Sequence, residues 1–210
     1  FSSYCQKALI ALYEHKVPFT YVMLSQENPV AIEVLVGRWP VKRFPMLIDD
    51  GRSIHEATII IEYLNAYYPG PVRLVPEDAK RAVEVRFMDR FFDNYISTPQ
   101  QKVVFDAMRK PEERDLKGVS DARDMLDKAY GWLDKHMTGR EWAAGEGFSL
   151  ADCAAAPFLF FADWTHEIAE RFENVRAYRA RLNRRPSFAR AIEEARPYRA
   201  YFPLGAPDRD

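Results

Sequence analysis

The alternation of hydrophobic and polar positions predicts a compact unit near the middle of the first half of the chain. Residues 46–48 are apolar and are followed by Asp50-Gly51, a dipeptide typical of a tight hairpin. A second short strand at 53–54 leads straight into a segment whose apolar residues recur at helical spacing. Those residues are Ile59, Ile60, Tyr63 and Leu64. The pattern therefore predicts strand, hairpin, strand and helix in succession.

The residues before this unit predict a helix, a strand and a second helix. A helix is expected over 6–15, with Ser2 or Ser3 as its N-cap. Residues 18–23 alternate as a strand does, and 29–36 forms a short helix that Gly37 ends. Together with the hairpin, this order of elements is typical of a small α/β domain, which we expect to span residues 1–70.

Beyond a predicted linker at 71–78, the pattern changes to helices alone, so residues 79–210 are expected to form an all-helical domain. Ser149 and Asp152 are spaced as in a capping box, at the start of a segment that is apolar on all sides. The predicted helices cover 79–108, 120–136, 154–161, 171–183 and 187–195. The fold class is thus α/β followed by all-α.

Composition excludes several classes of partner. The 210 residues include 30 Lys and Arg against 31 Asp and Glu, a balance that argues against nucleic acid. No apolar run reaches the roughly 20 residues of a membrane span, and no signal peptide is visible. Two cysteines, Cys5 and Cys153, do not make a disulfide framework, so a reducing, cytoplasmic location is expected. The four histidines show no metal-ligand spacing, and no metal is expected.

The start of the first predicted helix carries candidate chemistry. Ser2 and Cys5 share its first turn, where a serine hydroxyl could donate a hydrogen bond to a bound thiolate. The pattern alone favours a plain N-cap role for Ser2, and Ser3 is the alternative hydroxyl. Cys5 is expected to pack inward as a small apolar residue. The helix that begins near Glu56 presents free N–H groups suited to a carboxylate.

Two segments resemble the glutathione transferase superfamily, in its theta-like and zeta-like branches. Phe44-Pro45 matches a cis-proline that precedes a strand, and Glu56-Ala57-Thr58 matches the Glu/Gln-Ser/Thr helix start. The resemblance implies a thioredoxin-like first domain, an all-helical second domain and a homodimer. That fold has a central strand before its first helix. The sequence begins at Phe1, so the strand is either trimmed or missing, and we expect trimming.

The resemblance also implies roles for individual residues. Ser2 would stabilise the thiolate of glutathione, the cosubstrate, for attack on a small apolar electrophile, as in detoxification. Lys42 and Arg43 would meet the glycyl carboxylate, or would simply form a solvated turn. Residues expected to hold the tripeptide are Phe44, Pro45, Glu56, Ala57 and Thr58, and those expected to wall an acceptor pocket are Phe87, Met88, Phe91 and Tyr95. Ala57 replaces the usual hydroxyl, so binding is expected to be weak.

Two other functions stay open. Residues 39–45 and 54–57 look most like zeta-type members, which include maleylacetoacetate isomerase, although Tyr4 departs from their Ser-Ser-Cys start. A glutathione-dependent cis–trans isomerase is therefore the first alternative. A non-catalytic, dimeric binding module is the second, and the missing hydroxyl at Ala57 favours it.

Overall fold

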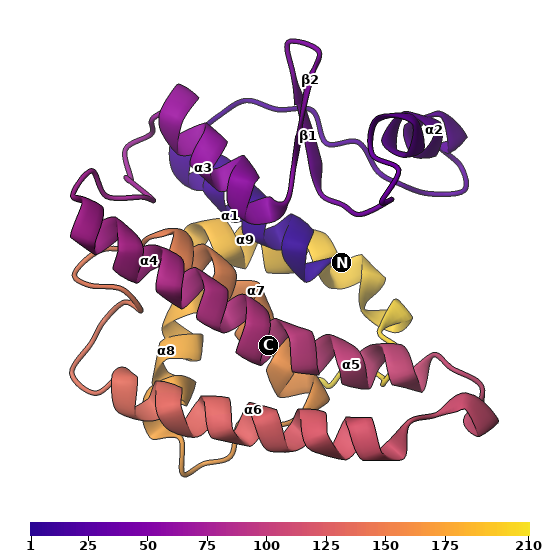
Figure 1. Cartoon of the computed structure of the whole chain (residues 1–210), viewed down its shortest axis with the longest axis vertical. Coiled ribbons are helices and arrows are strands. Elements are labelled where there is room, and N and C mark those ends of the chain that lie inside the picture. Colours follow the sequence, from indigo (N-terminus) through magenta and orange to yellow (C-terminus); the bar gives the residue numbers. More distant parts are fainter.

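The first part of the chain holds three helices and one β-hairpin in the computed structural model, which describes residues 1–210 (Figure 1). Its elements are α1 (Ser3–His15), α2 (Pro29–Arg38), β1 (Met46–Asp49), β2 (Arg52–His55) and α3 (Ala57–Tyr67). The two strands pair antiparallel, with Met46 opposite His55. Asp50 and Gly51 both have positive φ, at 46° and 76°, as a two-residue hairpin turn requires. The predicted hairpin and the helix after it are confirmed.

The strand predicted over 18–23 does not form. Residues 17–24 are irregular, and the side chains of Tyr21 and Met23 are 50% and 39% exposed. The only sheet consists of β1 and β2, so no neighbouring strand lies beside this segment to receive its backbone hydrogen bonds. Alternating side chains alone do not make a strand, and this prediction was wrong.

The rest of the chain is helical. Its elements are α4 (Ala79–Phe91), the π-helical turn η1 (Phe92–Ser97), α5 (Thr98–Ala107), η2 (Pro111–Glu113), α6 (Leu116–His136), α7 (Leu150–Thr165), α8 (Glu173–Asn183), α9 (Pro186–Ala195) and η3 (Arg196–Tyr201). The single helix predicted over 79–108 is interrupted by η1. Pro99 has no N–H for the carbonyl of Tyr95, and the N–H of Thr98 reaches back five residues to Asp93 instead. No helix in the molecule is both long and apolar enough to cross a membrane.

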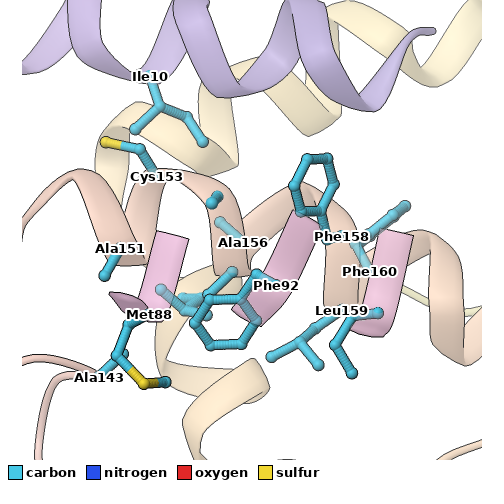
Figure 2. Packing of buried hydrophobic residues seen from close by; sticks show 14 of the residues in the cluster. Ile10, Met88, Phe92, Ala143, Ala151, Cys153, Ala156, Phe158, Leu159 and Phe160 are labelled. Atoms are coloured by element: carbon cyan, nitrogen blue, oxygen red, sulfur yellow. The ribbon is translucent and has the colours of Figure 1, made fainter. Parts of the chain in front are cut away.

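Helix α7 is the centre of the core. Every residue from Leu150 to Trp164 is buried, which confirms the all-round apolar prediction, and the capping box of Ser149 and Asp152 forms at its start. Figure 2 shows Ile10 of α1 facing Cys153 on one side of α7. The first part of the chain therefore packs its longest helix directly onto the helical part.

The connection between the two parts is anchored in the same core. Leu74 is fully buried and Val75 is 5% exposed, although both lie in the predicted linker 71–78. The N–H of Leu150 donates to the carbonyl of Leu74 at 2.8 Å, and Asn65 accepts from the N–H of Val75 at 3.2 Å. The linker thus connects the end of α3 to the start of α7 through hydrogen bonds and fixes how the two parts are placed against each other.

Candidate functional site

A cavity of about 530 Å³ lies between the two parts of the chain, at the starts of α1 and α3. These two helices pack side by side, so their N-termini reach the same space (Figure 1). Eight residues singled out from the sequence line it: Ser2, Ser3, Lys42, Arg43, Phe44, Pro45, Glu56 and Ala57. Two helix N-termini at one cavity favour an anionic ligand, because each end carries unpaired N–H groups and the positive end of a helix dipole.

At the start of α1, Ser2 both caps the helix and lines the cavity. Its Oγ accepts a long hydrogen bond, 3.4 Å, from the N–H of Cys5, and the residue also lines the cavity. Ser3 is the first residue of the helix and lines the same space. Burial raises the pKa of the Cys5 thiol, so this thiol stays protonated at neutral pH. A hydroxyl, rather than a thiolate of the chain, is therefore available to a ligand.

At the start of α3, the backbone is held in an uncommon conformation. Glu56 has a φ of 67°, which residues other than glycine seldom adopt, and no side chain caps the helix. Such outliers concentrate at ligand sites. Ala57 follows with no hydroxyl, so only backbone N–H groups can bind an anion at this end.

Thr58 points away from the cavity. Its hydroxyl donates to Asp89 of α4 at 2.9 Å and accepts from the ammonium of Lys7 at 2.8 Å. Lys7 and Asp89 form an ion pair at 2.6 Å, with side chains 0% and 1% exposed. Burial lowers the pKa of Lys7, and the carboxylate of Asp89 opposes that shift. Thr58 thus joins α1, α3 and α4 behind the site, and its hydroxyl is already occupied.

Between the two helix starts, the segment before β1 supplies the third edge of the cavity. The Phe44–Pro45 peptide bond is cis, as the resemblance implied. Lys42 and Arg43 are exposed and line the cavity beside it. Trp39 also lines the cavity and stacks on His55 with ring centroids 4.2 Å apart. The edge thus combines two cations with one broad aromatic surface.

The opposite wall comes from the helical part and was missed from the sequence. Its residues are Asp93, Gln100, Gln101, Val104, Phe105, Phe161, Phe202 and Pro203. Tyr4 of α1 bridges to it, because its hydroxyl donates to Asp93 and accepts from Ser97 at 3.2 Å. Burial raises the pKa of Tyr4 and keeps the phenol protonated. These residues come from four separate segments, and no local pattern marks them.

The four residues expected to wall an acceptor pocket lie elsewhere. Met88 and Phe91 are buried in the core, at 1% and 6% exposure. Phe87 and Tyr95 are 52% and 46% exposed, and the ring of Phe87 packs edge-on against Trp132 of α6. None of the four lines the cavity. Helical spacing identifies a face that runs along α4 into η1, and that face divides between the core and an outer surface.

A second, larger cavity of about 710 Å³ lies between α1, residues 17–23 and α9. None of the predicted binding residues lines it, although Phe1 and Cys5 on either side of the start of α1 do. No three His, Cys, Asp or Glu side chains come together as metal ligands anywhere in residues 1–210. The cavity at the starts of α1 and α3 is therefore the candidate site.

Comparison with protein families identifies both parts of the chain. Residues 1–72 match the model of the glutathione S-transferase N-terminal domain, and residues 100–186 match that of the glutathione S-transferase C-terminal domain. A probable glutathione S-transferase of Nicotiana tabacum is 30% identical over 156 residues, which cover 74% of this chain and 65% of that protein. The chain thus spans slightly less than two thirds of that relative.

Two further similarities bear on fold and function. A glutathione S-transferase of Methylobacillus flagellatus, solved with glutathione bound, superposes with a TM-score of 0.81 at 23% identity, covering 90% of this chain and 94% of that one. This likeness supports the fold. A probable maleylacetoacetate isomerase of Vibrio cholerae is 26% identical over 166 residues, covering 75% of this chain and 74% of that protein.

Proposed function

This chain belongs to the glutathione S-transferase superfamily, and we propose that it binds glutathione in the cavity between its two parts and conjugates the thiol to small electrophiles. One observation carries the proposal. Eight residues chosen from three separate segments of the sequence line a single cavity that two helix N-termini share. The solved relative with glutathione bound supports the choice of ligand.

The ligand's charges suit the cavity. The γ-glutamyl carboxylate would lie at the start of α3, against the backbone N–H of Ala57, with the Glu56 carboxylate near the amino group. Phe44 would pair through its backbone with the cysteinyl part, and Lys42 and Arg43 would meet the glycyl carboxylate. The thiol would then lie toward Ser2 at the start of α1.

Ser2 would stabilise the thiolate. A free thiol of pKa about 8.5 is only a few per cent ionised at pH 7, and lowering that pKa by about two units takes roughly 2.7 kcal/mol. A charge-assisted hydrogen bond of about 1.5–3 kcal/mol and the helix N-terminus together suffice. The sulfur then forms a bond to the electrophilic carbon, and a halide leaves with its electron pair.

A pH–rate profile with glutathione and 1-chloro-2,4-dinitrobenzene tests the catalytic role. Ser2→Ala should lower activity about tenfold near pH 7 and recover much of it by about pH 9, because the thiol pKa rises by roughly one unit. Ser3→Ala and Cys5→Ala are the matched controls and should leave the profile in place. A profile moved by Ser3→Ala alone would assign the role to Ser3, and loss in Cys5→Ala alone would indicate thiol chemistry of the chain itself.

Calorimetry tests the binding role separately. Glutathione should bind weakly, and Ala57→Ser should tighten it by about 0.5–1.5 kcal/mol by restoring a hydroxyl donor. If neither form binds glutathione, the result favours the alternative function, a non-catalytic binding module.

A glutathione-dependent cis–trans isomerase is the second candidate. The zeta-like residues 39–45 and the similarity to a probable maleylacetoacetate isomerase favour it. The same thiolate would add to a cis double bond and leave again after rotation. Conversion of a cis-configured diketo acid without net consumption of glutathione would distinguish this reaction from conjugation.

We further propose a homodimer in the cytoplasm. Exposed apolar side chains gather on α4 and α6, including Val83, Phe87 and Trp132, and Tyr67 at the end of α3 is 63% exposed. A second copy would cover this surface. Both cysteines are free, which suits a reducing compartment. Sedimentation should give twice the 24.4 kDa of one chain, and a concentration-independent monomer would refute the dimer.

A further inference from the structure

The orientation of the Gln100 side chain is set by its partner. The Thr165 hydroxyl has a single hydrogen and donates it to the Phe161 carbonyl at 2.8 Å, an atom that can only accept. Thr165 must therefore accept from the Gln100 amide nitrogen, which lies 3.1 Å away. The NH₂ end of Gln100 is held by this hydroxyl, and its carbonyl oxygen is the end left free.

Gln101 is oriented in the same way by a longer chain of hydrogen bonds. The Asp93 carboxylate, paired with Arg90, can only accept, so the Tyr4 hydroxyl donates to it. Tyr4 must then accept from Ser97 at 3.2 Å, which uses the only hydrogen of Ser97. Ser97 can therefore only accept from the Gln101 amide nitrogen, at 3.5 Å. The direction of every bond follows from the carboxylate at one end.

Both glutamines therefore leave a carbonyl oxygen open at the cavity. Gln100 and Gln101 line the cavity, and no group of the chain donates to either Oε1. Neither oxygen is among the fully buried polar atoms without a partner, so each keeps some accessible surface, and both glutamines line the cavity. A ligand without a donor would cover these oxygens and leave them unpaired, which is unfavourable. The neighbouring apolar residues are Val104, Phe105, Phe161, Phe202 and Pro203.

We propose that this wall selects electrophiles that carry an N–H or O–H donor on a small apolar skeleton, with primary amides as the best-matched class. The proposal rests on the proposed function, since it names the second substrate of the same site. In the reaction with a chloronitrobenzamide, the thiolate sulfur bonds to the ring carbon that bears chlorine. Chloride departs with the bonding electron pair, and no oxidant or reductant is needed.

The test uses ligands that share one aromatic skeleton and differ in whether the carbonyl substituent carries an N–H donor. The probes are the glutathione conjugates of 4-chloro-3-nitrobenzamide, its N,N-dimethyl amide and the corresponding methyl ester, measured by calorimetry. The parent protein should bind the primary-amide conjugate about fivefold to tenfold more tightly than either analogue, as one or two hydrogen bonds would give. The ester controls for the added bulk of the dimethyl amide.

Variants assign the preference to the two oxygens. Gln100→Met/Gln101→Met should reduce the ratio to less than about twofold, because methionine keeps the length and removes the acceptor. Gln26→Met, at an exposed position outside the cavity, is the control and should keep the full ratio. Tyr4→Phe frees the hydrogen of Ser97 to donate to Gln101, which turns that amide around, so the ratio should fall about twofold to threefold with both glutamines intact.

The outcomes separate this inference from the proposed function. Equal affinity of the parent for all three conjugates, or a ratio that survives Gln100→Met/Gln101→Met, overturns the inference. Conjugation of the three electrophiles at equal rates relative to their uncatalysed reactions also overturns it and leaves the transferase function standing. A retained preference in binding with no conjugation of any electrophile supports the donor-selective wall and refutes the transferase.

Discussion

Two carboxylates, Asp152 and Asp89, are almost completely removed from solvent, at 0% and 1% exposure, and they are stabilised in different ways. Asp152 accepts from the N–H of Ala143 at 3.0 Å, from the N–H and hydroxyl of Ser149 at 2.9 and 3.0 Å, and from the Tyr178 hydroxyl. Asp89 instead meets a full positive charge, the ammonium of Lys7, together with the Thr58 hydroxyl.

The two carboxylates differ in the number of groups that stabilise their charge and in the segments that supply those groups. Four neutral dipoles surround Asp152 within the helical part, so each contributes a fraction of its stabilisation. Asp89 depends mainly on the buried ammonium of Lys7 from α1, because its only other nearby cation is the half-exposed guanidinium of Arg90 at 3.8 Å. Removing Lys7 leaves a buried charge that the Thr58 hydroxyl and Arg90 do not balance. Asp152, within the helical part, is thus stabilised by several hydrogen bonds, whereas Asp89, at the junction between the two parts, depends mainly on one buried ion pair.

The largest effect is expected from breaking that ion pair. Lys7→Met should lower the free energy of unfolding by about 3–5 kcal/mol, because Asp89 is left charged and buried. Denaturant unfolding followed by circular dichroism measures it. Lys7→Met/Asp89→Leu removes both charges and should return close to the parent value. If the double variant is as unstable as the single one, the pair is essential for packing rather than for charge balance.

A smaller effect is expected at Asp152, where four groups donate to the carboxylate. Asp152→Asn should lower the free energy of unfolding by about 3 kcal/mol, because an amide nitrogen must face donors that the carboxylate accepted from. The same unfolding measurement applies, with Asp121→Asn as a control at an exposed carboxylate of α6 that pairs with Lys117 and should change stability little. A change below about 1 kcal/mol in Asp152→Asn would mean that the four hydrogen bonds do not stabilise the Asp152 carboxylate.

Removing one of the four groups around Asp152 should matter less. Ser149→Ala removes the hydroxyl and leaves the Ser149 N–H bond to Asp152, so a loss of about 1 kcal/mol is expected. Thermal unfolding should show a lower midpoint with activity per folded molecule unchanged. An unchanged midpoint would contradict the capping role.

The smallest effect is expected at a partly exposed ion pair between the same two parts. Arg86 of α4 donates to both oxygens of Glu62 of α3, at 2.6 and 2.9 Å. Glu62→Gln should cost about 0.2–1 kcal/mol, since water screens the pair. A loss as large as that of Lys7→Met would show that burial is not what separates the two pairs.

This pair also predicts a pH dependence. The hydrogen bond to Arg86 holds the pKa of Glu62 below its usual 4.5. Its contribution is therefore complete above about pH 4.5 and disappears as the pH falls through the lower pKa of the folded state. The stability difference between the parent and Glu62→Gln should shrink over that acidic range in urea titrations.

Local patterns were sufficient for one half of the candidate site. Asp50-Gly51 marked the hairpin, Ser2-Ser3 marked the start of α1, and the helical spacing of apolar residues in 59–64 marked α3, because turn, cap and spacing preferences act over a few residues. Ser149 and Asp152 were recognisable for the same reason. The cis bond at Phe44–Pro45 was anticipated through family resemblance, since residue preferences alone favour trans.

Tertiary structure decided what depends on distant partners. Lys7 and Asp89 are 82 positions apart, so no local sequence pattern around either residue predicts their ion pair. Residues 18–23 alternate like a strand but have no neighbour to pair with, and Phe87 follows helical spacing yet faces outward. Gln100 and Gln101 acquire a direction only from the hydroxyls of Thr165 and Ser97. Sequence determines backbone preference over a few residues, whereas burial, charge pairing and hydrogen-bond direction are set by the groups that folding brings together.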